Sequence, residues 1–139
     1  MSEAVERVRL GYEAFNRGDL DAALAGLHPD VEWSVLAFLP EAEVYRGPDG
    51  VRAFWEMWFE NFEEFQIEVE EIVDVGDRIL ALIAISGSGR GSGVDVQTPT
   101  FAQIWTYEEG KVTRVEMLIK EDALASLGLR EEDLKEPRR

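Results

Sequence analysis

Two polar side chains set among apolar neighbours, Tyr12 and Gln103, are the first candidates for chemistry in this sequence. Gln103 lies within residues 101–107, where large and small side chains alternate as they do in a strand. Its amide offers a hydrogen-bond donor and an acceptor, and the Tyr12 hydroxyl offers another donor. Together they could polarise a carbonyl while a water acts as the base. The alternatives are a buried glutamine bonded only to backbone and a tyrosine that merely packs.

Three further side chains could contact a ligand. The indole N–H of Trp33 would lie under a predicted apolar loop. Arg90 could pair with a ligand carboxylate or phenolate, or it could be an exposed loop arginine. His28 is the only histidine, and its place beside a proline at a predicted helix end favours a surface cap over a general base. The catalytic residues stay unassigned, with Gln103 and Tyr12 as the candidates.

The sequence gives little support for a disulfide or a metal site. The chain has no cysteine, which excludes disulfides and thiolate chemistry. Acidic residues crowd between Glu60 and Asp77, but histidine support and an Asp-x-Asp-x-Asp-Gly loop are both missing. This crowding is typical of a solvated helix end and of an edge strand kept soluble by repulsion. We expect no metal site and no cofactor.

Charge and hydropathy limit the partners and the location. The formal net charge is −15, from 29 acidic and 14 basic residues, which disfavours contact with nucleic-acid phosphates and anionic lipid. No apolar run reaches the roughly 18 residues that indicate a membrane span. The N-terminus lacks the basic-then-apolar order of a signal peptide. We expect a cytoplasmic protein that binds neither nucleic acid nor membrane.

The C-terminal half of the chain predicts the sheet that positions Gln103. Residues 79–85 are apolar at nearly every position, so both faces of this strand should be covered. Glu109 and Gly110 are a turn signal between strands at 101–107 and 111–119, which predicts a hairpin.

Three helices are predicted before that sheet, over residues 2–16, over residues 20–27 and from Pro48 onward. A strand over 31–35 and an apolar loop over 36–43, a candidate lid, separate the second and third. The third helix carries a mostly aromatic stripe, which could pack in the core or form the wall of a cavity. The stripe consists of Val51, Phe54, Trp55, Trp58 and Phe62.

The remaining segments predict the edges of the sheet and the end of the chain. Residues 66–75 predict a strand with a bulge near residues 70–71. The glycine-rich residues 87–93 are either a flexible hairpin end or a strand face emptied to leave room in a cavity. A last helix over 120–127 should end at Gly128.

Several stretches occur in a familiar order along nearly the whole chain. They are residues 12–21 (YEAFNRGDLD), 28–33 (HPDVEW), 45–55 (YRGPDGVRAFW), 91–94 (GSGV), 110–116 (GKVTRVE) and 123–129 (ALASLGL). Together they resemble the nuclear transport factor 2-like fold, and specifically its SnoaL-like branch. The resemblance implies a cone with a pocket at its open end, and homodimers formed through the outer sheet face. Enzymes of this fold include ketosteroid isomerase, scytalone dehydratase, limonene epoxide hydrolase and polyketide cyclases.

The catalytic sets of those enzymes do not carry over to this chain. The positions of the ketosteroid isomerase tyrosine, base and second acid fall on Gly11, Val35 and Gln103. Scytalone dehydratase uses pocket histidines, and this chain has only His28. The epoxide hydrolase set of two aspartates and an arginine is also missing at the inward strand positions, which are Gln103, Trp105, Val115, Met117 and Ile119.

We therefore predict one α+β domain, residues 1–129, followed by a charged tail, residues 130–139. The resemblance implies a cone-shaped α+β barrel, a curved, mostly antiparallel sheet wrapped around three N-terminal helices. The first functional hypothesis is binding of a small hydrophobic or aromatic molecule. The alternatives are a cofactor-independent isomerase, cyclase or dehydratase acting on a small ketone or polyketide-like substrate, and a structural dimerisation module whose own side chains fill the cavity. The expected pocket residues are Tyr12, Phe15, Trp33, Val35, Phe38, Phe54, Trp55, Trp58, Ile83, Ile85, Phe101, Gln103, Trp105, Val115, Met117 and Ile119.

Overall fold

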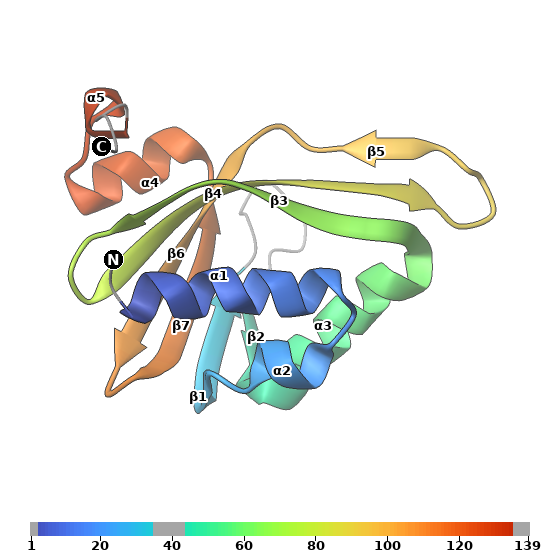
Figure 1. Cartoon of the computed structure of the whole chain (residues 1–139), viewed down its shortest axis with the longest axis horizontal. Helices are drawn as coiled ribbons and strands as arrows, with labels where there is room; N and C mark the ends of the chain where they lie inside the picture. Colours follow the sequence, from blue (N-terminus) through green and yellow to red (C-terminus); the bar gives the residue numbers. More distant parts are fainter. Residues whose placement is uncertain (1–2, 35–43, 135–139) are drawn as a thin grey trace.

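The computed structural model describes residues 3–34 and 44–134, and it confirms the predicted α+β class. Its seven-stranded sheet has the order β2-β1-β7-β6-β4-β3, with β5 paired to β4, and only the β1–β7 pair is parallel. Helices α1 and α3 pack against its inner face (Figure 1). The elements are α1 (Glu3–Asn16), α2 (Leu20–Leu24), β1 (Leu27–Ser34), β2 (Val44–Arg46), α3 (Gly47–Asn61), β3 (Phe62–Asp74), β4 (Arg78–Gly89), β5 (Asp95–Gln97), β6 (Phe101–Glu108), β7 (Lys111–Leu118), α4 (Lys120–Leu127) and α5 (Glu131–Leu134).

Strand β4 is buried on both faces, as its continuous apolar run predicts. Ile79 and Ile83 belong to the main core under α1 and α3. Leu80 and Leu82 lie on the outer face, where they pack in a second cluster with Leu124 of α4. Helix α4 thus covers the outer face of β4 and β6 with apolar side chains, which the periodicity of β4 requires.

The tight turns lie where the sequence places them. Strands β6 and β7 are joined by Glu109 and Gly110, whose φ angles are +52° and +80°. This is the backbone that a two-residue hairpin turn needs, and glycine adopts it without a steric cost. Helix α4 ends at Gly128 in the left-handed conformation, also as predicted. The register of β3 against β4 shifts between Val69 and Glu71, which confirms the predicted bulge.

The second helix is shorter than predicted, and the strand after it begins earlier. Helix α2 ends at Leu24, and β1 begins at Leu27 instead of at residue 31. Pro29 lies inside β1, where the register against β7 shifts between Leu27 and Glu32. A proline is tolerated at such an irregularity because no ladder hydrogen bond needs its missing N–H. The prediction that Pro29 stops the second helix is therefore wrong, because the helix ends at Leu24 and Pro29 lies within the strand.

The third helix and the strand after it also have different limits from those predicted. Phe62, expected on the helix stripe, is the first residue of β3, which begins four residues before the predicted strand. The early part of β3 contains a second irregularity between Glu63 and Gln66, with Glu64 at a φ of +53°. This extra bend brings the start of β3 back beside the end of α3.

The glycine-rich segment forms a hairpin, and one of its glycines accommodates aromatic rings. Residues 86–88 of β4 pair with residues 95–97 of β5. A Cβ built on Gly87 would lie 3.2 Å from the Phe65 ring and 3.4 Å from Cβ of Phe62. The absent side chain therefore makes room for core rings, and the idea that it leaves cavity volume empty is wrong at this position.

Two further features concern the outer strands and the chain end. Arg114 of β7 forms a salt bridge with Glu32 on the neighbouring strand β1, at 3.7 Å. The expected tail begins with the helical turn α5. The homodimer through the outer sheet face stays a prediction.

Asn16, the last residue of α1, joins this helix to the sheet. Its amide nitrogen donates to the carbonyl oxygen of Ile67 on β3 at 2.9 Å, and its Oδ1 accepts from the Ile67 N–H at 2.8 Å. One side chain thereby satisfies both backbone groups of a strand residue. This contact fixes the position of α1, which carries Tyr12 and Phe15.

Replacing Asn16 with alanine should lower the free energy of unfolding by about 1–3 kcal/mol, because both backbone groups of Ile67 lose their partner. Urea unfolding measures this change. Asn61→Ala is the matched control, since that side chain makes one exposed bond to the Met57 carbonyl. Equal effects of the two substitutions would contradict the role given to Asn16.

Candidate functional site

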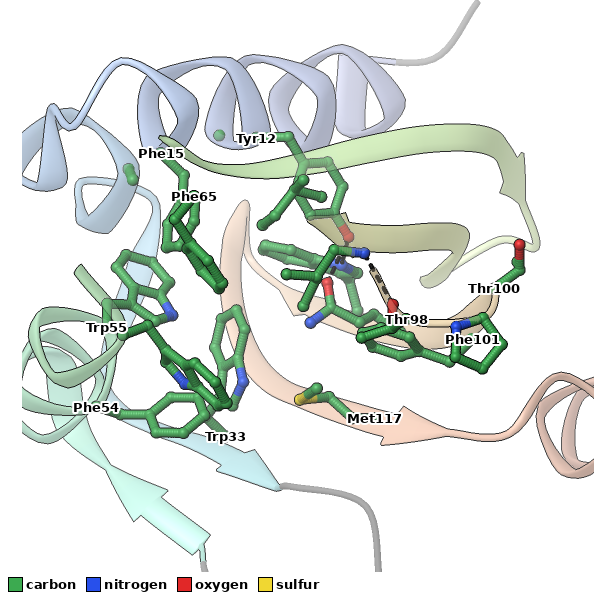
Figure 2. Close-up of a pocket in the computed structure, with 18 of the residues that line it drawn as sticks. Tyr12, Phe15, Trp33, Phe54, Trp55, Phe65, Thr98, Thr100, Phe101 and Met117 are labelled. Atoms are coloured by element: carbon green, nitrogen blue, oxygen red, sulfur yellow. Dashed lines mark hydrogen bonds between the residues drawn. The ribbon is translucent and has the colours of Figure 1, made fainter. Parts of the chain in front are cut away.

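A cavity of about 300 Å³ lies between the helices and the inner face of the sheet. Figure 2 shows Trp33, Phe54 and Trp55 on one side of it, and Tyr12, Thr98 and Phe101 on the other. Its walls are made by Gly11, Tyr12, Phe15, Ala23, Trp33, Phe54, Trp55, Trp58, Phe65, Ile67, Ile85, Thr98, Pro99, Thr100, Phe101, Gln103, Trp105, Met117 and Ile119.

The walls are mainly aromatic, and the rings pack edge to face. All four tryptophans of the chain line the cavity. The Trp33 ring lies 5.3 Å from Trp55 and 5.6 Å from Trp105, with interplanar angles of 87° and 79°. Phe15 meets Trp55 in the same way, at 5.2 Å and 85°. Such T-shaped contacts are favourable for aromatic rings and fix each ring against its neighbours. The rings therefore form rigid walls around a space that they do not fill.

Strand register explains which predicted residues reach the cavity and which do not. Val115 on β7 is paired with Trp33 on one side and with Trp105 on the other. Its side chain is fully buried between those strands, and it is not part of the wall. Ile83, also expected in the pocket, is likewise fully buried in the core behind the wall. Alternation along a strand predicts which side chains point to the inner face of the sheet. It does not predict which of them line the cavity and which are buried behind its wall.

Two other predicted residues, Val35 and Phe38, lie outside the described residues, as does the candidate lid loop. Every other predicted pocket residue is in the wall. The sequence reasoning missed Gly11, Ala23, Phe65, Ile67, Thr98, Pro99 and Thr100. For Phe65 and Ile67 a signal was present, because they share one parity of β3 ahead of the bulge.

Thr98 and Thr100 belong to the connection between β5 and β6. The hydroxyl of Thr98 accepts a hydrogen bond from the Ile85 N–H at 2.9 Å, and Thr100 donates to Glu70. No periodic pattern marks such a connection, so these residues carried no sequence signal that they would face the cavity.

A chain of hydrogen bonds crosses the cavity wall from β6 to α1 and back. The indole N–H of Trp105 donates to the Tyr12 hydroxyl oxygen at 3.0 Å. The Tyr12 hydroxyl in turn donates to Oε1 of Gln103 at 2.5 Å. We call this the Trp105–Tyr12–Gln103 relay. The 2.5 Å distance fits an O–H···O bond and is too short for an N–H···O bond, so Oε1 and not Nε2 of Gln103 faces Tyr12.

Two hydrogen-bond donors in the cavity wall, one of them in the relay, have no partner among the described residues. The Nε2 group of Gln103 has no hydrogen-bond acceptor among the described residues, although the side chain is only 3% exposed. The indole nitrogen of Trp33, a residue only 4% exposed, is also buried with no partner in the described part of the chain. A buried donor is normally satisfied, so the unpaired Trp33 N–H in the cavity wall is a functional signal.

The ionisable groups of the site stay neutral near physiological pH. Burial raises the pKa of Tyr12 above its ordinary value of 10.0, although the hydrogen bond from Trp105 opposes the shift and nearby Tyr107 adds to it. Tyr12 is therefore a donor and cannot serve as a base. Asp, Glu, His, Lys and Arg are all absent from the described lining residues.

Arg90 and His28, the other polar candidates, are occupied elsewhere. The Arg90 side chain donates to the Phe59 carbonyl oxygen at 3.1 Å and pairs with Glu63 at 3.4 Å. It ties the β4–β5 hairpin to the end of α3. His28 accepts from the Asp30 N–H through Nδ1 at 2.9 Å, which is a local turn contact. Neither residue is part of the cavity wall.

Within residues 3–34 and 44–134, no group of three or more His, Cys, Asp or Glu side chains could hold a metal ion. In the same residues no helix is long and apolar enough to cross a membrane.

Comparisons with known proteins agree on the fold. The family model for the SnoaL-like domain matches residues 8–115. A structure of an NTF2-like protein of unknown function from Burkholderia pseudomallei K96243 is 27% identical, with a TM-score of 0.74 over 91% of this chain and 98% of that one. TerC, co-crystallised with polyporic acid, is 25% identical, with a TM-score of 0.72 over 91% and 98% of the two chains.

A proposed polyketide cyclase from Xanthomonas campestris pv. campestris is also 25% identical, with a TM-score of 0.66 over 89% of this chain and 96% of that one. A search of the curated proteins finds no significant match.

The relay predicts that Tyr12→Phe lowers the free energy of unfolding by about 1–3 kcal/mol, because the Trp105 donor and the Gln103 acceptor stay buried without a partner. Urea unfolding measures the loss. Tyr107→Phe is the control, since no described side chain bonds to that hydroxyl. An unchanged stability of Tyr12→Phe would contradict the relay.

Alkaline pH should destabilise the fold through its buried tyrosines. Burial raises the pKa of Tyr107 to about 12, with Arg7 opposing the shift. Between the ordinary value of 10.0 and about 12, the unfolded chain loses this proton while the folded chain keeps it. The stabilisation is therefore complete below pH 10 and is lost as the pH rises through this window. Urea unfolding at several pH values measures this loss. In Tyr107→Phe the free energy of unfolding should decline less steeply with pH than in the wild-type protein, and the same slope in both would contradict the prediction.

Proposed function

Because the chain belongs to the SnoaL-like domain family, we propose that it binds a small hydrophobic or aromatic molecule in the cavity between α1, α3 and the sheet. The observation that carries the proposal is a cavity of about 300 Å³ with aromatic walls and no charged lining residue among those described. This volume is at the lower end of the range for small-molecule sites, which suits a compact molecule of two or three fused rings.

The chemistry of the wall favours an uncharged ligand. Moving a charged group from water into an apolar cavity is costly unless an opposite charge or several hydrogen bonds receive it. The described wall offers no cation, and the chain carries a net charge of −15. An aromatic ligand gains the burial of its faces and edge contacts with the tryptophan rings.

One of the similar structures supports the binding of a small molecule. TerC was co-crystallised with polyporic acid, and its fold covers nearly all of this chain. At 25% identity this likeness supports a small-molecule ligand but does not name it.

An enzymatic function is the second candidate, favoured by the likeness to a proposed polyketide cyclase. A carbonyl held by the Gln103 amide would be polarised, which helps proton transfer next to it. The base would have to be a water or a group of the substrate, since the described wall contains no carboxylate or histidine. Turnover of a ketone substrate that is lost in Gln103→Leu would favour this candidate over simple binding.

Filling the cavity tests the proposed binding. Gly11 lies on α1 in the cavity wall, and a Cβ built there meets no atom within 4 Å. Gly11→Leu should place a side chain in the cavity and abolish binding of fluorene, an uncharged tricyclic probe, as followed by quenching of tryptophan fluorescence.

Gly11→Ala is the matched control. It should keep fluorene binding and raise the free energy of unfolding by about 0.5–1 kcal/mol, because alanine is the better helix former. If fluorene fails to bind the wild-type protein, or if it binds Gly11→Leu equally well, the proposed function is wrong.

A further inference from the structure

We propose that the cavity selects aromatic ligands that carry an uncharged carbonyl oxygen, such as an aryl ketone or lactone, and that Gln103 and Trp33 donate hydrogen bonds to it. This inference rests on the proposed binding function and adds the chemical class of the ligand. It also assigns two specificity-determining residues.

The orientation of the Gln103 amide is the first step. The contact of 2.5 Å between the Tyr12 hydroxyl and Gln103 has the length of an O–H···O bond, so Tyr12 donates to Oε1 while its oxygen accepts from Trp105. The opposite end of the amide, which carries two N–H groups, is left for a partner other than Tyr12. Gln103 is itself part of the cavity wall. A ligand acceptor is the partner that this arrangement lacks.

The fixed position of the Trp33 indole is the second step. Its ring is held edge to face between Trp55 and Trp105, so it cannot turn toward another acceptor without breaking both contacts. Its N–H is nevertheless buried with no partner among the described residues. A preorganised donor that is unsatisfied in the free protein gains a full hydrogen bond when a ligand oxygen arrives.

Both donors belong to the same cavity. Trp33 pairs with Val115 on β7, and Gln103 pairs with Met117 on the same strand. Val115 and Met117 are two residues apart, so they share a face of β7. Trp33 on β1 and Gln103 on β6 therefore lie on either side of β7, and both side chains are in the wall of this one cavity.

The type of acceptor follows from the surrounding charge. Both unpaired groups are neutral donors, and the described wall holds no cation to balance a carboxylate. Arg90, the candidate partner for a ligand carboxylate, is paired with Glu63. A neutral carbonyl oxygen accepts from N–H donors without the cost of burying a charge.

Fluorenone and fluorene test the proposal, because they share a planar tricyclic frame and differ in the carbonyl. In equilibrium dialysis the wild-type protein should bind fluorenone more tightly than fluorene, by about 3- to 10-fold for each hydrogen bond. Fluorenone-4-carboxylate should bind more weakly than fluorenone. The infrared carbonyl band of bound fluorenone should shift to lower frequency than in a hydrocarbon solvent.

Three substitutions locate the donors. Gln103→Leu and Trp33→Phe should each reduce the preference for fluorenone over fluorene by about 3- to 10-fold. Trp58→Phe is the matched control, because it removes the same atoms from the same wall, its indole is not an unpaired buried donor, and its ring packs against Phe54, Phe62 and Phe65. It should change the affinity for both probes alike and leave their ratio unchanged.

The outcomes separate this inference from the proposed function. If neither probe binds, the proposed function fails and the inference falls with it. If both bind equally and the carbonyl band of fluorenone is unshifted, the cavity binds aromatic molecules but the inference about the carbonyl is wrong. The infrared readout uses the wild-type protein, so it decides the question even if Gln103→Leu does not fold.

Discussion

The Tyr12 hydroxyl, which joins Trp105 to Gln103, is the interaction on which the character of the site depends. It links α1 to β6 through the cavity wall and satisfies polar groups that would otherwise be costly to bury. It also sets which end of the Gln103 amide faces α1, because the contact of 2.5 Å has the length of an O–H···O bond. The consequence is a cavity with hydrogen-bond donors but no charge, surrounded by rings. That combination suits recognition of a neutral oxygen better than proton abstraction by a side chain.

The aromatic walls explain how a cavity persists in a domain of this size. Protein interiors are normally close-packed, and flexible side chains would close over an empty space. Here the wall is built from rings that support one another, such as Trp33 against Trp55 and Phe15 against Trp55. Each ring is also attached to a strand or helix that other contacts hold in place. Helix α1, for example, is held by the hydrogen bonds between its Asn16 and Ile67 of β3. A ring would have to lose these contacts to fill the cavity.

Much of the fold could be predicted from the sequence, because local signals and tertiary structure agree in it. The Glu109-Gly110 turn needs positive φ angles that glycine readily adopts, and the apolar run of β4 requires cover on both faces. The errors arose where tertiary pairing overrides a local signal. Pro29 was interpreted as a helix stop ahead of the strand, yet it lies in β1 at a register shift. Val115 is covered because its register places it between Trp33 and Trp105. Alternation along one strand says which face a side chain is on, but it does not give this register.

A crystal structure of the protein with fluorenone tests the central claim most directly. The account predicts the ligand in the cavity, with its carbonyl oxygen about 3 Å from the Gln103 amide nitrogen and the Tyr12 hydroxyl still between Trp105 and Gln103. A cavity filled by the tryptophan and phenylalanine rings, or a ligand whose oxygen points away from both unpaired donors, would contradict it.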